Sequence, residues 1–244
     1  MNTLAEPSPP EFFWSIPEDF PAPGTDDILV WSAWLDDAAG EPTEILSADE
    51  RARARSFHYQ VDRRRFEAAH VVLRQLLGRC AGVDPATLVF ATGRFGKPGL
   101  ASPGGTDLRF NLAHAGPLAL VAVARGRAVG VDVEHVRDFV DLALLERQLF
   151  PEIALAFHQP FPAVRRRDEF FRRWTEHEAV AKLHGTGLGA TPDDPQPSRG
   201  EVLDPAGGFI GHLAYEGAPA RISRHRWPGA RGFGAVLAPG ATAA

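Results

Sequence analysis

The segment Gly130-Val-Asp-Val-Glu134 constrains the fold more strongly than any other stretch of the chain. Apolar and acidic side chains alternate along it, and such alternation predicts a β-strand, in which side chains two residues apart share a face. Val131 and Val133 would then face a hydrophobic core. Asp132 and Glu134 would project together from the other face. We therefore expect a sheet with one buried face and two carboxylates on the opposite side.

Two convergent carboxylates on a rigid strand can hold a hard cation such as Mg²⁺, together with waters and the phosphates of a substrate. Mn²⁺ suits the same ligands. The alternative is that both acids are solvated on an exposed strand face, and the motif alone leaves both interpretations open.

The segment Trp174-Thr-Glu-His-Glu-Ala-Val-Ala-Lys182 predicts a helix with one distinctive stripe. Helical spacing of four residues places Trp174, Glu178 and Lys182 on the same face. Glu178 could supply a third carboxylate to the cation, and Lys182 could neutralise a phosphate. A Glu–Lys pair at this spacing is also a common surface ion pair of little energetic weight. The chain has only two lysines among its 26 basic residues, and this scarcity favours a function for Lys182.

Three further features could contact an anion. His114 ends the apolar segment Phe110-Asn-Leu-Ala-His114 beside a glycine turn, a common place for function, although a single histidine is more often structural. Lys97, the other lysine, belongs to Gly93-Arg-Phe-Gly-Lys-Pro98, which could equally be an ordinary surface turn. Arginines at 51, 53, 55 and 63–65 could pair with phosphates bidentately or cover solvated helix faces.

Composition excludes several classes of protein. The single cysteine, Cys80, excludes a disulfide framework and a cysteine-based zinc site. No stretch reaches the roughly 18 consecutive apolar residues of a membrane span, and the N-terminus lacks the features of a secretory signal. The net charge of −5 and the lack of a recognition helix argue against nucleic-acid binding. We expect a soluble cytoplasmic protein.

The charge is segregated along the chain. Residues 1–50 hold 12 acidic residues and no basic ones, so the rest of the chain holds 26 basic and 19 acidic residues. A body with this excess of positive charge suits a polyanionic ligand.

The pattern of elements predicts an α+β fold of two similar halves. A capping box at Ser47 and Glu50 starts a helix that ends near Tyr59, and a second helix runs from about residue 61 to Gly82. We expect other helices at 141–149 and 166–183, and strands at 28–34, 88–91, 108–112, 118–124 and 129–134. Strands at 209–215, 221–227 and 233–237 are expected to form an antiparallel meander. The expected divisions are a proline- and acid-rich surface leader at 1–27, an N-terminal half at 28–126 and a C-terminal half at 127–244.

Together these elements resemble the Sfp-type 4′-phosphopantetheinyl transferases. The resemblance runs in order along residues 45–190 and rests on a basic helix before Phe57 and on five segments: Phe95-Gly-Lys-Pro98, Phe110-Asn-Leu-Ala-His114, Gly130-Val-Asp-Val-Glu134, Trp174–Lys182 and Gly185-Thr-Gly-Leu188. Members of this family transfer phosphopantetheine from coenzyme A to a serine of an apo acyl or peptidyl carrier protein and release adenosine 3′,5′-bisphosphate. The resemblance implies a monomeric pseudo-dimer of two α+β halves, with coenzyme A in the cleft between them. It also favours carriers of non-ribosomal peptide and polyketide synthesis.

The resemblance implies roles for individual residues. Asp132, Glu134 and Glu178 would bind Mg²⁺ on the pyrophosphate, and Glu178 would also act as general base towards the serine. Lys182 and His114 would hold phosphate oxygens and stabilise the leaving group. The other residues in contact with coenzyme A would be Arg53 at the 3′-phosphate, Arg65 as a second basic position, the segment Phe95, Gly96, Lys97 and Pro98 along the adenine pocket with Lys97 near the phosphates, and Ala113 beside His114.

Two positions depart from the family pattern. Ala113 stands where the family usually has Ser, which removes a hydroxyl ligand and about 1 kcal/mol of hydrogen bonding. His177 stands where the family usually has Lys, which is expected to increase the pH dependence. Neither change removes a metal ligand, so we expect activity. Two alternatives remain open: a degenerate homologue that only binds coenzyme A or carrier proteins, and a Mg²⁺-dependent pyrophosphate hydrolase.

Overall fold

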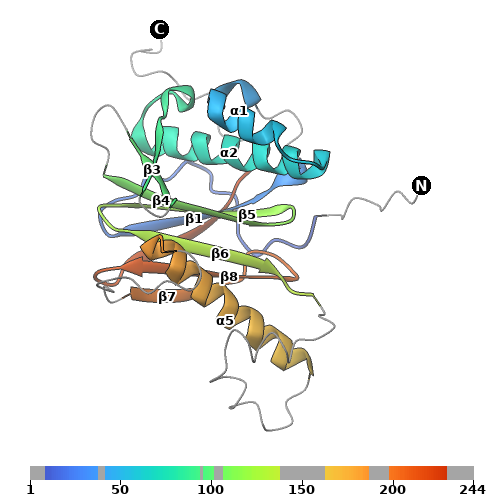
Figure 1. Ribbon diagram of the computed structural model, residues 1–244. Helices are drawn as coiled ribbons and strands as arrows, with labels where there is room; N and C mark the ends of the chain where they lie inside the picture. Colours follow the sequence, from blue (N-terminus) through green and yellow to red (C-terminus); the bar gives the residue numbers. More distant parts are fainter. Residues whose placement is uncertain are drawn as a thin grey trace, which may run out of the picture.

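In the computed structural model, two β-sheets pack face to face and helices cover their outer sides (Figure 1). The structure describes residues 9–37, 42–93, 96–101, 107–137, 163–186 and 198–229. This arrangement confirms the expected α+β fold of two halves. None of the helices in the described ranges is long and apolar enough to cross a membrane.

The first sheet has its strands in the order β4-β5-β1-β9. Their bounds are Leu108–Ala115 for β4, Leu118–Arg125 for β5, Asp27–Trp34 for β1 and Arg221–Arg226 for β9. Both β4 and β1 are antiparallel to β5, and β9 is parallel to β1. A small hairpin of β2 (Phe90–Thr92) and β3 (Pro98–Leu100) lies outside this sheet.

Two helices cover the outer face of the first sheet. The capping box forms as expected: Ser47 Oγ accepts from the Glu50 N–H, and the Glu50 carboxylate accepts from the Ser47 N–H. It starts α1 (Ala48–Arg55), which ends earlier than expected, and α2 (Gln60–Ala81) follows and stops at Gly82 in the left-handed region, with φ +67°. The apolar side of α2 packs on β1, β4 and β5. Short 3-10 helices η1, η2 and η3 occupy Leu35–Asp37, Thr43–Ile45 and Pro85–Thr87.

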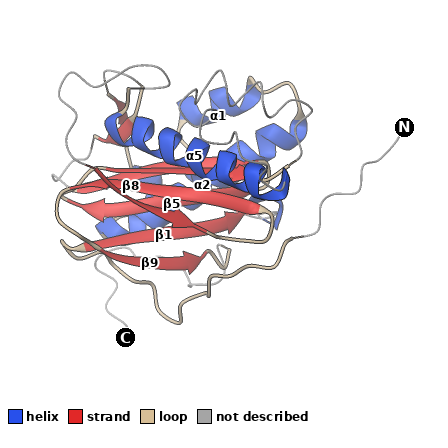
Figure 2. Ribbon diagram, turned by 90° about the horizontal axis from the view of Figure 1, so that it is seen from below, coloured by secondary structure: helices blue, strands red, loops and turns tan. Residues whose placement is uncertain are grey.

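The second sheet has the order β6-β8-β7 and is antiparallel throughout. Its strands are β6 (Val129–His135), β8 (Phe209–Glu216) and β7 (Ser198–Leu203), and its outer face is covered by α5 (Ala163–His184). Figure 2 shows that α5 lies across the outer face of this sheet, on the opposite side of the two sheets from α2. Along β6 the expected alternation holds, because Val131 and Val133 enter the core between the sheets.

The C-terminal strands correct one expectation. The meander expected after residue 200 does not form, because β9 leaves β8 and pairs with β1 in the other sheet. The hydrophobic pattern of a strand determines which face is buried, but it does not determine the partner strand. Each sheet therefore includes part of the chain from beyond residue 200. The expected helix at 141–149 and the expected strand at 233–237 lie outside the described residues.

The proline-rich leader also differs from the expected surface segment. Its Trp14 is 9% exposed and belongs to the core between the two sheets. The N–H of Phe13 donates to the Pro205 carbonyl of the C-terminal half, whereas Phe20 stacks on Trp31 of β1. The described part of the leader therefore contacts both halves.

Candidate active site

The acidic side chains of β6 face α5 and meet polar groups of that helix. Lys182 Nζ lies 2.5 Å from Asp132 Oδ1, and Trp174 Nε1 donates a hydrogen bond of 3.1 Å to Glu134 Oε1. The predicted helical stripe and the predicted strand face are therefore opposite each other. Glu178 lies between Trp174 and Lys182 on the same stripe.

Gly130 explains how the strand and the helix come so close. A Cβ atom at this position would overlap the Ala179 carbonyl oxygen and the Leu183 amide nitrogen of α5. Only a residue without a side chain lets the last turns of the helix lie directly on β6. This contact places Lys182 beside Asp132.

The three carboxylates influence one another electrostatically. Burial raises the pKa of Asp132, and the Lys182 ammonium opposes this shift. Burial followed by repulsion from Asp132 raises the pKa of Glu134, and the same two causes raise the pKa of Glu178. An added positive charge among them would oppose all three shifts and stabilise the charged forms.

The described residues do not form a finished metal site. No three His, Cys, Asp or Glu side chains in these ranges gather closely enough to hold a metal ion. However, Asp132 Oδ2 is buried and has no hydrogen-bond partner. Carboxylate oxygens are the donors that Mg²⁺ prefers. The three carboxylates therefore fit a divalent cation in both donor type and charge. In this structure the Lys182 ammonium neutralises part of their negative charge.

Basic groups continue from Lys182 towards the N-terminal half. His114 lies near the end of β4, where loss of hydration and the positive charges of Lys182 and Arg65 lower its pKa. Arg65 donates two hydrogen bonds to the Asp36 carboxylate, at 2.8 and 2.7 Å. His114 thus lies near two positive charges, whereas Arg65 is already paired with a carboxylate.

His70 lies near both His114 and Arg53, and no motif in the sequence pointed to it. The His70 ring packs on the Phe66 ring, with 3.9 Å between the two centroids. The Arg53 guanidinium carbon lies over the Phe66 ring, 5.8 Å from its centroid. Burial lowers the pKa of His70, and the charges of Arg53 and His114 lower it further. The one signal in the sequence was its position one helical turn after Phe66.

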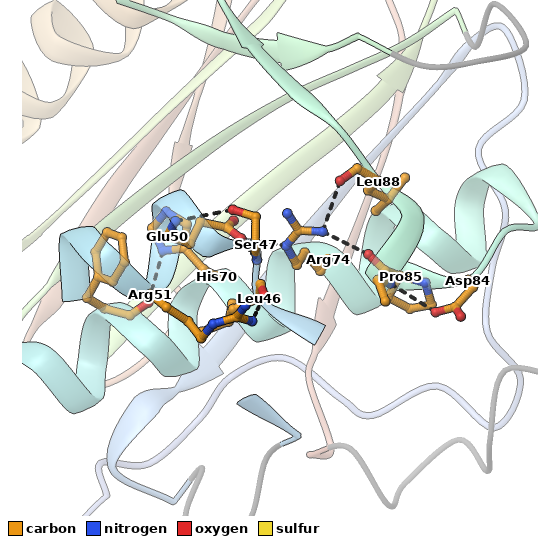
Figure 3. Close-up of polar contacts among 11 residues, drawn as sticks. Leu46, Ser47, Glu50, Arg51, His70, Arg74, Asp84, Pro85 and Leu88 are labelled. Atoms are coloured by element: carbon orange, nitrogen blue, oxygen red, sulfur yellow. Dashed lines mark hydrogen bonds and ion pairs between the residues drawn. The ribbon is translucent and has the colours of Figure 1, made fainter. Parts of the chain in front are cut away.

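A buried arginine holds the helix that carries Arg53. Arg74 is 1% exposed and donates to Glu50 Oε2 at 2.8 Å, to the Pro85 carbonyl at 2.9 Å and to the Leu88 carbonyl at 3.1 Å (Figure 3). Since Glu50 is also the acid of the capping box, α1 is joined to α2 and to the loop before β2. Breaking a buried pair of this kind leaves an uncompensated charge.

Lys97 has partners other than the phosphate that the sequence predicted. Its ammonium donates to the carbonyls of Val129 and Leu183, at 2.9 and 2.8 Å. Gly96 and Pro98 flank it at the exposed tip of the β2–β3 hairpin, whereas Phe95 lies outside the described residues.

Ala113 lies on the opposite side of β4 from His114. Its methyl group packs in the core between the sheets, so only its backbone could contact a ligand. The neighbouring Asn111 uses its side-chain oxygen to accept a 2.8 Å hydrogen bond from the Val131 N–H of β6. This bond ties β4 to the acidic strand.

Two family models match consecutive parts of the chain. The model described as 4′-phosphopantetheinyl transferase, N-terminal, matches residues 31–126, and that of the 4′-phosphopantetheinyl transferase superfamily matches residues 128–224. The chain is also 35% identical to the 4′-phosphopantetheinyl transferase HetI of Nostoc sp. over 168 residues, which cover 67% of this chain and 71% of HetI. The chain belongs to the 4′-phosphopantetheinyl transferase superfamily.

Two further relatives share a smaller fraction of identical residues with this transferase. It is 30% identical to a phosphopantetheinyl transferase of Thraustochytrium sp., over 59% of this chain and 54% of the relative. It is 27% identical to a 4′-phosphopantetheinyl transferase of Bacillus subtilis, over 62% of this chain and 66% of the relative. These matches confirm the family to which the motifs pointed, and they identify the protein as an enzyme of the transferase class.

Proposed function

We propose that the protein transfers the 4′-phosphopantetheine group of coenzyme A to a serine of apo acyl or peptidyl carrier proteins. The serine oxygen forms a bond to the phosphorus that carries the pantetheine arm, the bond from that phosphorus to the bridging oxygen breaks, and adenosine 3′,5′-bisphosphate leaves. The observation that carries this proposal is the meeting of acidic and basic groups at the seam between the halves. Lys182 pairs with Asp132, and its charge acts on Glu134, Glu178 and His114.

Each group at the seam has a task in this reaction. Glu178 would accept the proton of the serine hydroxyl, and its raised pKa brings it nearer to the value that suits a base at neutral pH. Lys182 and His114 would donate hydrogen bonds to the phosphate oxygens on which negative charge accumulates. Arg53 and Arg65 would attract the 3′-phosphate.

A divalent cation fits this reaction. Asp132, Glu134 and Glu178 would hold Mg²⁺ or Mn²⁺, and the cation would neutralise the diphosphate when bound. The unpartnered Oδ2 atom of Asp132 supports this assignment.

The substrates that we propose follow from the family resemblance, and the location follows from the single cysteine. Carrier domains of non-ribosomal peptide and polyketide synthases are the proposed acceptors, and the cytoplasm is the proposed location. We also propose a monomer, since one chain carries both the N-terminal and the superfamily match.

A mass measurement tests the proposed reaction. The protein is incubated with coenzyme A, Mg²⁺ and each of several apo carrier proteins, and intact carriers are weighed by mass spectrometry. We expect the gain of one phosphopantetheine group, and no gain on a carrier whose acceptor serine is replaced by alanine. Release of adenosine 3′,5′-bisphosphate without any carrier would instead indicate a pyrophosphate hydrolase. Binding of coenzyme A with no product of either kind would indicate a degenerate homologue.

A further inference from the structure

The two hydrogen bonds of Lys97 join parts of the protein that are far apart in sequence. Lys97 comes from the β2–β3 hairpin of the N-terminal half, Val129 begins β6, and Leu183 lies in the last turn of α5. We refer to these two hydrogen bonds as the Lys97 bridge. Among the described residues, it links the hairpin directly to the strand and helix that carry the acidic residues.

The surroundings of Lys97 are those of a residue built into the fold. Burial lowers its pKa to about 8, Arg109 contributes in the same direction, and Glu216 opposes the shift. The ammonium is therefore mainly charged at neutral pH, and two of its three donors are used by carbonyls. Its stem also packs against Gly185, where an added Cβ would lie 3.2 Å from the Lys97 Cβ.

The bridge lies at the helix terminus that carries Lys182. Carbonyls in the last turn of an α-helix lack intrahelical partners, and a cation there is favoured by the helix dipole. Lys97 satisfies the carbonyl of Leu183, the residue that directly follows Lys182. Gly185 then ends the helix with φ +70°, and the Thr186 N–H donates back to the Ala181 carbonyl. The last turn of α5 is thus held by a hydrogen bond from Lys97 of the hairpin and by a backbone hydrogen bond at its own C-terminus.

We propose that Lys97 is a positioning residue of the transferase, which holds the last turn of α5 on β6 and so places the Lys182 ammonium at Asp132 and at the reacting phosphates. This inference rests on the proposed function, and it assigns Lys97 a role different from that of a direct phosphate ligand. A ligand would act on the affinity for coenzyme A. A positioning residue would act on the catalytic step through Lys182.

Kinetics of Lys97→Met and a double-mutant cycle with Lys182→Met separate these roles. In the otherwise wild-type enzyme, loss of hydrogen bonds from a charged donor is expected to lower kcat about tenfold or more, with KM for coenzyme A within about twofold of wild type. In the Lys182→Met background, Lys97→Met is expected to cause no further loss, because residues that act through one another are not additive. Arg127→Met is the matched control, since it removes a cation that donates to the Ala218 carbonyl, and its kinetics should be those of wild type.

Chemical rescue excludes a purely steric effect. In Lys97→Cys, alkylation with 2-bromoethylamine rebuilds an ammonium of the same reach, whereas bromoethane adds an uncharged arm. The native thiol Cys80 is 4% exposed, and burial raises its pKa to about 12, so it should not react. We expect the amine to restore kcat and the ethyl group to leave it low.

A spectroscopic measurement on the wild-type protein does not depend on activity. Lys97 and Lys182 are the only lysines, so selective ¹⁵N-lysine labelling gives two side-chain ammonium signals. Scalar couplings from Lys97 Nζ to the carbonyl carbons of Val129 and Leu183 are expected, and amide exchange at 183–186 should be about tenfold faster in Lys97→Met. Absence of the couplings, or additive kinetic effects with a raised KM for coenzyme A, would overturn the inference. An inactive wild type that shows these couplings would instead refute the proposed function alone.

Discussion

The two oxygens of the Asp132 carboxylate have different environments. Oδ1 is paired with Lys182, whereas Oδ2 is buried and has no partner. A buried carboxylate that satisfies only one oxygen retains part of its desolvation cost, and a cation at the second oxygen would remove it. Lys182 and a metal ion could therefore bind the same carboxylate, one on each oxygen. Glu178, which we also propose as a ligand of that cation, would act as the base.

Glu178→Gln tests the assignment of the base. The substitution keeps the size of the side chain and removes its ability to accept a proton, so we expect transfer to fall about 10²–10⁴-fold. Transfer rates to an apo carrier protein, with circular dichroism to verify folding, provide the measurement. Glu176→Gln is the control, since Glu176 is an exposed acid on the same helix. Wild-type rates in a folded Glu178→Gln enzyme would refute the assignment.

Cys80 supplies a test of pH dependence. The thiol is packed in the core under α2, and burial raises its pKa from 9.0 to about 12. Because the folded protein favours the neutral thiol over the thiolate, the protonated Cys80 contributes to the stability of the fold, and this contribution is fully present below pH 9. As the pH rises from 9 towards 12 it should be lost, by up to about 1.4 kcal/mol per pH unit.

Two measurements examine this prediction. Iodoacetamide at pH 8 should label the folded protein far more slowly than the protein in guanidinium chloride, since the thiolate is the nucleophile. Urea unfolding at several pH values should show a steeper loss of stability above pH 9 in the wild type than in Cys80→Ala. Equal slopes, or rapid labelling of the folded protein, would contradict it.

At the scale of elements, α5 and β6 form the unit on which the site depends. Their contact is close because Gly130 has no side chain, and Trp174 and Lys182 each reach one of the two acids of the strand. The sequence predicted both elements and which residues share a face, since alternation and helical spacing are local properties. That the two elements meet was implied only by the cation that their three carboxylates were expected to share, because alternation and helical spacing do not determine how distant segments pack.

Gly130→Ala should disrupt this unit. The new methyl group would overlap the backbone of α5 at Ala179 and Leu183, and overpacking of this kind typically costs about 1–3 kcal/mol. Urea unfolding should show the loss, and transfer activity should fall with it as Lys182 moves from Asp132. Gly99→Ala on β3 is the matched control, because a Cβ atom there would meet nothing within 4 Å. Equal stability of the two variants would show that α5 does not rest on Gly130.

Short strands and strand pairing were the features of the fold that local sequence patterns predicted least well. β3 and β7 were not predicted, because β3 spans three residues and β7 begins with the exposed residues Ser198, Arg199 and Gly200. β9 was predicted as a strand, but its parallel partner β1 lies almost two hundred residues earlier in the chain. The candidate site was easier to predict than the topology, since its residues lie within short motifs.

At the scale of the whole molecule, the two halves share one core. The cluster between the sheets contains residues of β1, β5, β6 and β8, and Trp14 of the leader packs among them. Together with β9, which crosses to the first sheet, this shared core joins the halves into one cooperative unit. We therefore expect a single unfolding transition, seen at the same denaturant concentration by fluorescence and circular dichroism.

Substitution of two neighbouring residues of the leader, Trp14 and Phe13, tests this cooperativity. Trp14 is 9% exposed in the shared core, whereas Phe13 beside it is 57% exposed. Truncation of a buried aromatic side chain typically costs about 3–5 kcal/mol, so Trp14→Ala should lower the free energy of urea unfolding by such an amount. Phe13→Ala should change it by about 0.5 kcal/mol or less. If the leader were only a surface segment, both variants would match the wild type. If the halves unfolded independently, Trp14→Ala would split the transition in two.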